Sequence, residues 1–288
     1  MPSDLCRIGI SKFGCIGAVP LLDLILDERA DRKDIEVRVF SSGAKLDEDS
    51  CTGPTQSLID YGPHLVLSVS PNAALPGPTK SRTLLTEARL PTITVSDGPG
   101  KKAFFKKDKD GKKVKVTIEG QGFIILPVDS MIGARREFLD PTEMAIFNAD
   151  IIKVLSITGV IRLLQNEIGN VIAQIKEGKT PEMPELVVTA DIAIEHAGFA
   201  NSNGRAKAYA AFKITEAVST LTTKACFVAK DASIYIPMVA AGHEMLRAAA
   251  SLADEAREIE KQNDTVLRTP HSSKGKMLRK TRLLDKPE

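Results

Sequence analysis

The stretch LVLSV at residues 65–69 decides the fold, because a short, mainly apolar run of this kind predicts a buried strand. Similar strands are predicted around it at 6–10, 35–40, 92–95 and 123–126, with helices between them at 21–26, 56–61 and 79–88. This alternation predicts an α/β fold with a mostly parallel, doubly wound sheet and helices on both faces. Residues 35–40 alternate apolar and polar side chains, which favours a position near an edge of the sheet.

The second half of the sequence predicts helices. The motif Asp140-Pro141-Thr142-Glu143 predicts a helix start, since Asp140 can cap the helix, Pro141 suits its first position and Glu143 can close the cap. This helix is expected to end at Gly159 or to continue to Gly169, and two more are predicted at 206–223 and 239–261. The last one carries a heptad-like seam, which packs within the chain or between subunits: Met245, Ala249, Leu252, Ala256 and Ile259.

These patterns divide the chain into three parts. Residues 1–140 are expected to form the α/β domain, with a small basic hairpin near 101–118; residues 141–265 form a helical bundle region, and residues 266–288 form a basic tail. Segment 101–115 holds eight lysines around Asp110-Gly111, and is either a solvated surface hairpin or an electrostatic funnel for an anionic ligand. The tail is either partly disordered or wrapped around a neighbouring subunit.

Composition excludes several classes of protein. The 288 residues carry 39 Lys or Arg against 37 Asp or Glu, and this near balance argues against a chain-wide polyanion binder. Aromatic residues make up only 5%, which leaves few platforms for stacking nucleic-acid bases. No apolar run reaches 18 residues, and the N-terminus lacks the features of a signal peptide. We therefore expect no nucleic-acid partner and no membrane association.

The titratable and nucleophilic residues are scattered. The four cysteines form no CxxC pair, which argues against a zinc or iron–sulfur site and favours a reduced, cytoplasmic setting. The four histidines are isolated, and no GxSxG motif occurs. We therefore expect no metal and no covalent intermediate. An enzyme of this kind would act by orienting its substrate and a cofactor that carries the chemistry.

A ligand is expected beyond the carboxyl ends of the strands, where five loops gather at 11–17, 41–45, 70–77, 96–100 and 127–136. The first lacks a complete GxGxxG, but Gly14 and Gly17 let the backbone approach a planar ligand or phosphate, unless they form a plain turn. Three prolines lie between Ser70 and residue 78, at the third loop and directly after it, which makes this loop a rigid wall of a site or a structural connection.

The fourth and fifth loops offer charged side chains. Asp97 either forms an Asx turn or accepts hydrogen bonds from a ligand ring. Asp129 and Ser130 open the fifth loop, and the adjacent Arg135 and Arg136 suit bidentate capture of a phosphate or carboxylate. The alternative is a surface ion-pair network of these arginines with Glu137 and Asp140.

Several longer motifs point to a known family. They are LLDLILDERADR at 21–32, PNAALPGP at 71–78, GARREFLDP at 133–141, Asn148-Ala149-Asp150, the run from His243 to Glu258, and VLRTPH at 266–271. In this order, and over nearly the whole chain, they resemble the coenzyme F420-dependent methylenetetrahydromethanopterin dehydrogenases of methanogenic and related archaea. The resemblance implies an α/β domain, a helical region and a homohexamer.

The resemblance also implies the activity of an oxidoreductase in methanogenesis and one-carbon metabolism. Methylenetetrahydromethanopterin gives a hydride reversibly to oxidised F420, a 5-deazaflavin, which produces the methenyl cation and reduced F420. The deazaflavin is a dissociable co-substrate, and neither a bound flavin nor a metal is implied. Both substrates carry phosphate and carboxylate tails, which are plausible targets for Arg135, Arg136 and the lysine cluster.

Candidate site residues follow from loop position and motif overlap. For coenzyme F420 they are Gly14, Ile16, Gly17, Ser70, Pro71, Asn72, Asp97, Gly98 and Pro99; for the pterin substrate they are Asp129, Met131, Arg135, Arg136 and Glu137. No residue is expected to act in acid–base catalysis. Asp97 and Asp129 are candidate orienting carboxylates, which hold the polar edge of the pterin or favour the developing cation.

Three other functions compete with this one. A nicotinamide-dependent dehydrogenase should show GxGxxG and a ribose-binding acid after the second strand, but Ser41-Ser42-Gly43 stands there. A non-enzymatic oligomer that binds anions or nucleotides would use the basic tail and show steeply salt-dependent binding. A structural oligomer built on the helical seam would not account for the glycines and charged residues of the loops.

Overall fold

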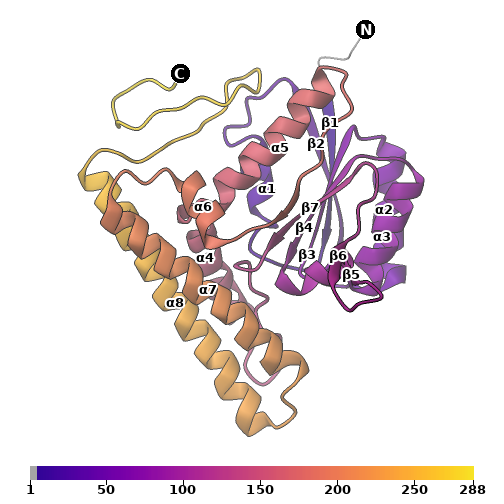
Figure 1. Cartoon of the computed structure of the whole chain (residues 1–288), viewed down its shortest axis with the longest axis vertical. Helices are drawn as coiled ribbons and strands as arrows, with labels where there is room; N and C mark the ends of the chain where they lie inside the picture. Colours follow the sequence, from indigo (N-terminus) through magenta and orange to yellow (C-terminus); the bar gives the residue numbers. More distant parts are fainter. Residues whose placement is uncertain (1–4) are drawn as a thin grey trace.

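The computed structural model describes residues 5–288 and contains a six-stranded sheet with the order β2-β1-β3-β4-β7-β8 (Figure 1). Every neighbouring pair in this sheet is parallel, so the predicted fold class is confirmed. The strands are β1 (Cys6–Phe13), β2 (Ile35–Gly43), β3 (Leu65–Ser70), β4 (Thr92–Asp97), β7 (Gln121–Leu126) and β8 (Glu185–Val187). The predicted edge position of residues 35–40 is also confirmed, because β2 ends the order.

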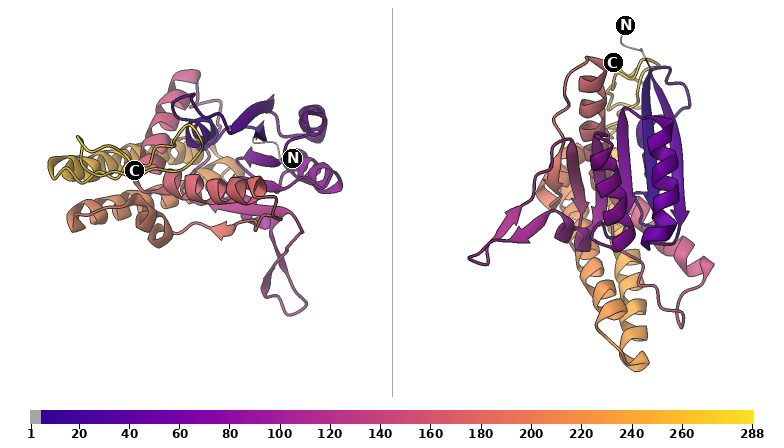
Figure 2. Two further views of the ribbon diagram at one scale, coloured as in Figure 1. Left: turned by 90° about the horizontal axis from the view of Figure 1, so that it is seen from above. Right: turned by 90° about the vertical axis from the view of Figure 1, so that its right-hand side faces the viewer.

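Helices cover both faces of the sheet because successive side chains of a strand point to opposite faces. In β3, Leu65 and Leu67 join the main apolar cluster with α1 (Leu21–Leu26) and α5 (Val160–Lys176). Val66, between them, packs in a separate cluster with Leu58 of α2 (Glu48–Tyr61) and Leu85 of α3 (Pro76–Glu87). Figures 1 and 2 show α2 and α3 side by side on their face.

Two helices begin earlier in the chain than the sequence predicts. α2 begins at Glu48 rather than 56, because Asp47 caps it by accepting a hydrogen bond from the backbone N–H of Ser50, and Pro54 is accommodated inside the helix. α3 begins at Pro76 rather than 79, with proline in its first turn. β1 and β2 each extend three residues beyond the predicted strand ends.

The lysine-rich segment forms the predicted hairpin. After the 3-10 helix η1 (Gly98–Ala103), β5 (Phe105–Lys107) pairs antiparallel with β6 (Lys113–Lys115). Gly111 takes a φ of +77° in the connecting turn, which glycine adopts without strain. The hairpin projects away from the six-stranded sheet (Figure 2).

The helix predicted from Asp140 begins as expected but ends at a glycine. α4 (Pro141–Ile157) is capped by Asp140, whose carboxylate accepts from the backbone N–H of Glu143 at 2.8 Å. The extension to Gly169 is wrong, because Gly159 takes a φ of +95° and α5 starts at the next residue. A Cβ at Gly159 would lie 2.0 Å from the carbonyl oxygen of Ala193, so this break is also a close packing contact with α6 (Ala190–Ala197).

The two longest helices form a hairpin that extends away from the sheet (Figure 1). α7 (Ser202–Phe227) packs along α8 (Ala232–Gln262), and the seam residues Ala249 and Ala256 are fully buried. The seam therefore packs within the chain, as one of its two interpretations proposed. Glycine at 242 brings the helices close, since a Cβ there would lie 2.9 Å from Thr222 Cγ2.

Two features of the second half escaped prediction. β8 is a strand inside the segment expected to be helical, and it pairs with β7, but its three half-buried residues are too few to show a period. The basic tail lies against its own chain, where the imidazole Nδ1 of His271 is 2.9 Å from Glu28 Oε2 and the hydroxyl of Thr269 donates to Gln165. Within residues 5–288, no single helix is long and apolar enough to cross a membrane; only α4 and α5 taken together, bent by 67°, meet that length and composition test.

Candidate active site

All five predicted loops gather at the carboxyl edge of the sheet. The backbone N–H of Gly14 donates to the carbonyl of Gly43 at 2.9 Å, and a Cβ at Gly14 would lie 2.9 Å from Pro71 Cδ. Gly14 takes a φ of +75°, so glycine serves both this turn and this close approach. The N–H of Ala73 donates to Ser96 Oγ at 3.0 Å, which joins the third loop to the end of β4.

The side chain of Asp129 joins the fifth loop to the first through hydrogen bonds. Its side chain is fully buried, and its two oxygens accept from the backbone N–H groups of Gly17 at 2.6 Å and Ala18 at 2.8 Å. Glycine is needed at 17, since a Cβ there would lie 2.1 Å from Ile151 Cγ2. Burial raises the pKa of Asp129 to about 7, although these two hydrogen bonds oppose the rise.

Asp97 fastens the fourth loop to the fifth and to α7. Its fully buried carboxylate accepts from the adjacent N–H of Gly98, from the hydroxyl of Ser219 at 3.0 Å and from the N–H of Met131 at 3.3 Å. Burial raises its pKa to about 8, the nearby charge of Asp129 adds to the rise, and the hydrogen bonds oppose it. The local turn was one predicted role of Asp97; Ser219 as its partner was not predicted, because a lone serine inside a helix gives no sequence signal.

The two carboxylates share an unusual setting. Neither has a cationic partner in any ion pair of residues 5–288, and both direct their oxygens at backbone or hydroxyl donors inside the protein. They therefore hold the loops in place rather than reaching a ligand directly, and in their ionised forms they put negative charge beneath the loops. A buried charge in a low-dielectric region acts on nearby charges more strongly than an exposed one.

Arg135, one of the two arginines predicted to capture an anion, contacts α7 and Tyr235. Its guanidinium donates to the carbonyls of Ala225 at 2.7 Å and Ala229 at 2.7 Å, and lies 4.1 Å from the ring centre of Tyr235. These carbonyls lie at and just beyond the C-terminal end of α7, where cations are favoured. Arg135 is therefore engaged by α7 and only Arg136 is exposed, and capture of an anion by the two arginines stays a prediction.

The alternative of an ion-pair network around these arginines is not formed. Within the described residues, no ion pair joins Arg135 or Arg136 to Glu137 or Asp140. The exposed carboxylate of Glu137 instead hydrogen-bonds with Tyr235, and Asp140 caps α4.

Two of the remaining candidates, Gly98 and Pro99, line a hollow at this edge. Ile16, Ser70 and Pro71 are buried, and the side-chain oxygen of Asn72 accepts from the N–H of Ala74 at 3.0 Å. Half-buried Gly98 and Pro99 open onto a cavity of about 530 Å³, whose other walls are Pro127, Glu216, Ser219, Thr220 and Thr223. The α7 wall of this cavity was missed, because a helix far along the chain gives no sign that it faces these loops. The volume is within the range of small-molecule sites.

The chemistry that this edge supports is orientation. Glycine and proline walls admit flat rings, and buried negative charge beneath them favours positive charge on a bound group. Among residues 5–288, no group of three or more His, Cys, Asp or Glu is arranged to hold a metal ion. Cys15 is an exposed residue of the first loop, but partial burial of its sulfur and, to a smaller extent, the charge of Asp129 raise the pKa of its thiol.

Comparison with known proteins gives one consistent match. The family model for methylene-5,6,7,8-tetrahydromethanopterin dehydrogenase matches residues 6–288. The F420-dependent methylenetetrahydromethanopterin dehydrogenases of Archaeoglobus fulgidus and Methanothermobacter thermautotrophicus are 53% and 50% identical, each over 98% of this chain and 99% of the relative. A solved structure of F420 dependent methylene-tetrahydromethanopterin dehydrogenase, in complex with methylene-tetrahydromethanopterin and coenzyme F420, superimposes with a TM-score of 0.90 at 40% identity, over 99% of this chain and 100% of that one.

Proposed function

Because the chain belongs to the methylene-5,6,7,8-tetrahydromethanopterin dehydrogenase family, we propose that it transfers a hydride between 5,10-methylenetetrahydromethanopterin and coenzyme F420. The reaction is reversible and gives 5,10-methenyltetrahydromethanopterin and reduced F420. One observation carries this function: the fold matches, over its whole length, a solved F420-dependent enzyme in complex with both substrates. Neither the nicotinamide-dependent nor the non-enzymatic alternative has comparable support.

The coenzyme is a dissociable co-substrate and supplies the carbon that accepts the hydride. The chain's own task is to hold two flat rings face to face at contact distance. We place the coenzyme against the loops that carry Gly14, Gly17, Pro71 and Gly98, which gather at the carboxyl edge of the sheet. The pterin then lies toward the fifth loop, near Met131 and Arg136.

The buried carboxylates have an electrostatic task in this scheme. Loss of the hydride leaves a positive charge on the methenyl product, and the ionised forms of Asp97 and Asp129 stabilise that charge from beneath the loops. They are positioning residues, since their oxygens are occupied by backbone and hydroxyl donors. No side chain is required to remove a proton from the carbon that gives up the hydride.

Assembly and location also form part of the proposal. The resemblance to the family supports a homohexamer of this chain. The scattered cysteines, all four of them free in the structure, support a reduced, cytoplasmic setting.

The function is tested by mixing the purified protein with oxidised F420 and methylenetetrahydromethanopterin while following the visible absorbance of the coenzyme. Loss of the oxidised band is expected only when both substrates are present, and without added flavin or metal. A parallel reaction with a nicotinamide coenzyme is the control. Turnover with the nicotinamide coenzyme but not with F420 would reassign the cofactor. No turnover with either coenzyme would contradict the proposal.

A further inference from the structure

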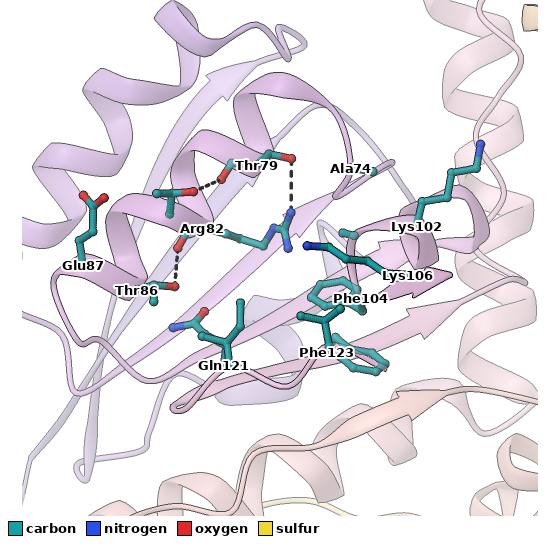
Figure 3. Close-up of a pocket in the computed structure, with 14 residues that line it drawn as sticks. Ala74, Thr79, Arg82, Thr86, Glu87, Lys102, Phe104, Lys106, Gln121 and Phe123 are labelled. Carbon is teal, nitrogen blue, oxygen red and sulfur yellow. Dashed lines mark hydrogen bonds between the residues drawn. The ribbon is translucent and has the colours of Figure 1, made fainter. Parts of the chain in front are cut away.

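A second hollow lies beside the carboxyl edge, between α3 and the basic hairpin (Figure 3). It has a volume of about 560 Å³. Its floor is aromatic, because the rings of Phe104 and Phe123 stack with centroids 4.4 Å apart and both side chains are buried. Phe105 closes against Phe123 edge-on at 5.8 Å, so the floor is a packed platform.

Arg82 of α3 lies over this floor with part of its guanidinium unused. Its Nη2 donates to the carbonyl of Ala73 at 3.0 Å, and the guanidinium carbon lies 5.0 Å from the ring centre of Phe104. Its Nε is buried and has no hydrogen-bond partner in the structure. Among residues 5–288 no carboxylate forms an ion pair with the half-buried side chain of Arg82, although a buried donor without a partner is costly.

A second cation converges on the same place. In Figure 3 the side chain of Lys106, from β5, points toward Arg82 across the floor. The acidic residue that lines the hollow, Glu87, stands at its other end. An anion bound between these two side chains would offset the repulsion of their like charges.

We propose that this groove binds the anionic tail, with its phosphate and carboxylate groups, of the deazaflavin coenzyme. The inference rests on the proposed function and adds a specific subsite to it. A planar guanidinium with free donors suits phosphate and carboxylate oxygens, and a lysine on a hairpin adds a mobile point charge. Of the two interpretations of the lysine-rich segment, the structure thus favours an anion-binding role for Lys106.

The groove belongs to the coenzyme rather than to the pterin because of its neighbours. Ala74 and Lys102 line it and directly continue the third and fourth loops, where we place the coenzyme. Arg82 is bonded to the carbonyl of Ala73 and so is joined to the third loop. The fifth loop, where we place the pterin, is instead joined to α7, because the hydroxyl of Ser130 donates to the carbonyl of Thr215 at 3.0 Å.

The test compares oxidised F420 with the same deazaflavin that lacks the phosphate and glutamate groups. Lys106 is exposed, so the Lys106→Gln variant should fold normally. Lys109→Gln is the matched control, because it removes one positive charge from the turn of the same hairpin. Lys106→Gln should raise KM for F420 roughly three- to tenfold, with kcat within about twofold and no change for the tail-less deazaflavin. Arg82→Met should raise KM for F420 by about tenfold or more, and Lys109→Gln should leave both coenzymes unaffected.

Binding is also measured without turnover, as a Kd for each coenzyme from its fluorescence. If wild-type protein binds F420 more tightly than the tail-less deazaflavin but turns over neither, the proposed function is contradicted, whereas the proposal that the groove binds the coenzyme tail is supported. Equal Kd values for the two coenzymes overturn the groove, even when turnover is normal. An Lys106→Gln effect on KM for methylenetetrahydromethanopterin alone also overturns it, because the tail would then belong to the pterin. If F420 does not bind at all, both proposals fail.

Discussion

Buried carboxylates at the two ends of the sheet have opposite electrostatic surroundings. At the amino end, Asp34 precedes β2 and is fully paired: Arg32 contacts it with two nitrogens at 3.0 and 2.8 Å, and Lys176 donates to it at 3.0 Å. These cations hold its pKa at about 2, although burial opposes them. At the carboxyl end, Asp97 and Asp129 lack cations and have pKa values raised by burial to about 8 and about 7. The amino end therefore holds an ionised, paired carboxylate that stabilises the fold, whereas the carboxyl end holds two carboxyl groups that become charged only as the pH rises through about 7 to 8.

The largest expected effect is at the amino end. Asp34→Ala leaves Arg32, whose side chain is only 4% exposed, without its anion, and should lower the free energy of unfolding by about 3–5 kcal/mol. The matched control is Asp254→Ala, which breaks an exposed ion pair with Lys153 and should cost less than about 1 kcal/mol. Urea unfolding measures both. Equal losses in the two variants would show that Asp34 is not a structural anchor.

The next effect is steric and lies at the carboxyl end. Gly17→Ala places a methyl group 2.1 Å from Ile151 and 2.9 Å from Asp129 Oδ1, so it should cost about 1–3 kcal/mol and displace the first loop. Displacement of the first loop should also lower kcat. Activity assays at a temperature where the variant stays folded measure this decrease. Gly169→Ala, in α5 with open space around it, should instead stabilise the protein by about 0.5–1 kcal/mol. Unchanged turnover in Gly17→Ala would remove this loop from the site.

The smallest effect is a pH dependence of opposite sign at the two ends. Because the pKa of Asp34 is lowered, its stabilisation is present above the ordinary pKa near 4 and is lost as the pH falls toward about 2. Because the pKa values of Asp97 and Asp129 are raised, their protonated forms favour folding, and that contribution is lost as the pH rises through about 7 to 8. Thermal unfolding from pH 5 to 9 should show this decline, and Asp97→Asn should make it shallower. A decline of the same steepness in Asp97→Asn would contradict the assignment.

The sequence was informative wherever a pattern is local. Strand runs such as 65–69, the cap at Asp140 and the Asp110-Gly111 turn all specify their structure through neighbours in the chain, and each is found. β8 was not predicted, because its three residues carry no local pattern and form a strand only by pairing with β7. Gly159 likewise breaks a helix through a φ of +95° and a contact with α6, neither of which a helical pattern reveals.

Site residues were harder to assign than the edge that holds them. The five loops follow from the rule for parallel sheets, but the partners of each side chain depend on where distant helices lie. Arg135 is bound by the end of α7 some 90 residues away, and Asp97 by Ser219 at a separation of 122. Arg82 became a candidate only because the hairpin brings Phe104 and Lys106 to it.

The central claim is that buried negative charge at the carboxyl edge assists hydride transfer, and Asp97→Asn tests it most directly. Asparagine can keep the hydrogen bonds to Gly98 and Ser219 and lose only the long one to Met131, so the fold should persist. We predict that kcat with F420 falls by about tenfold or more at pH 9, where a pKa of about 8 leaves Asp97 mostly ionised. KM values and the unfolding midpoint near pH 6, where Asp97 is mostly protonated, should change little. A folded Asp97→Asn variant with the kcat of the wild type would contradict the account.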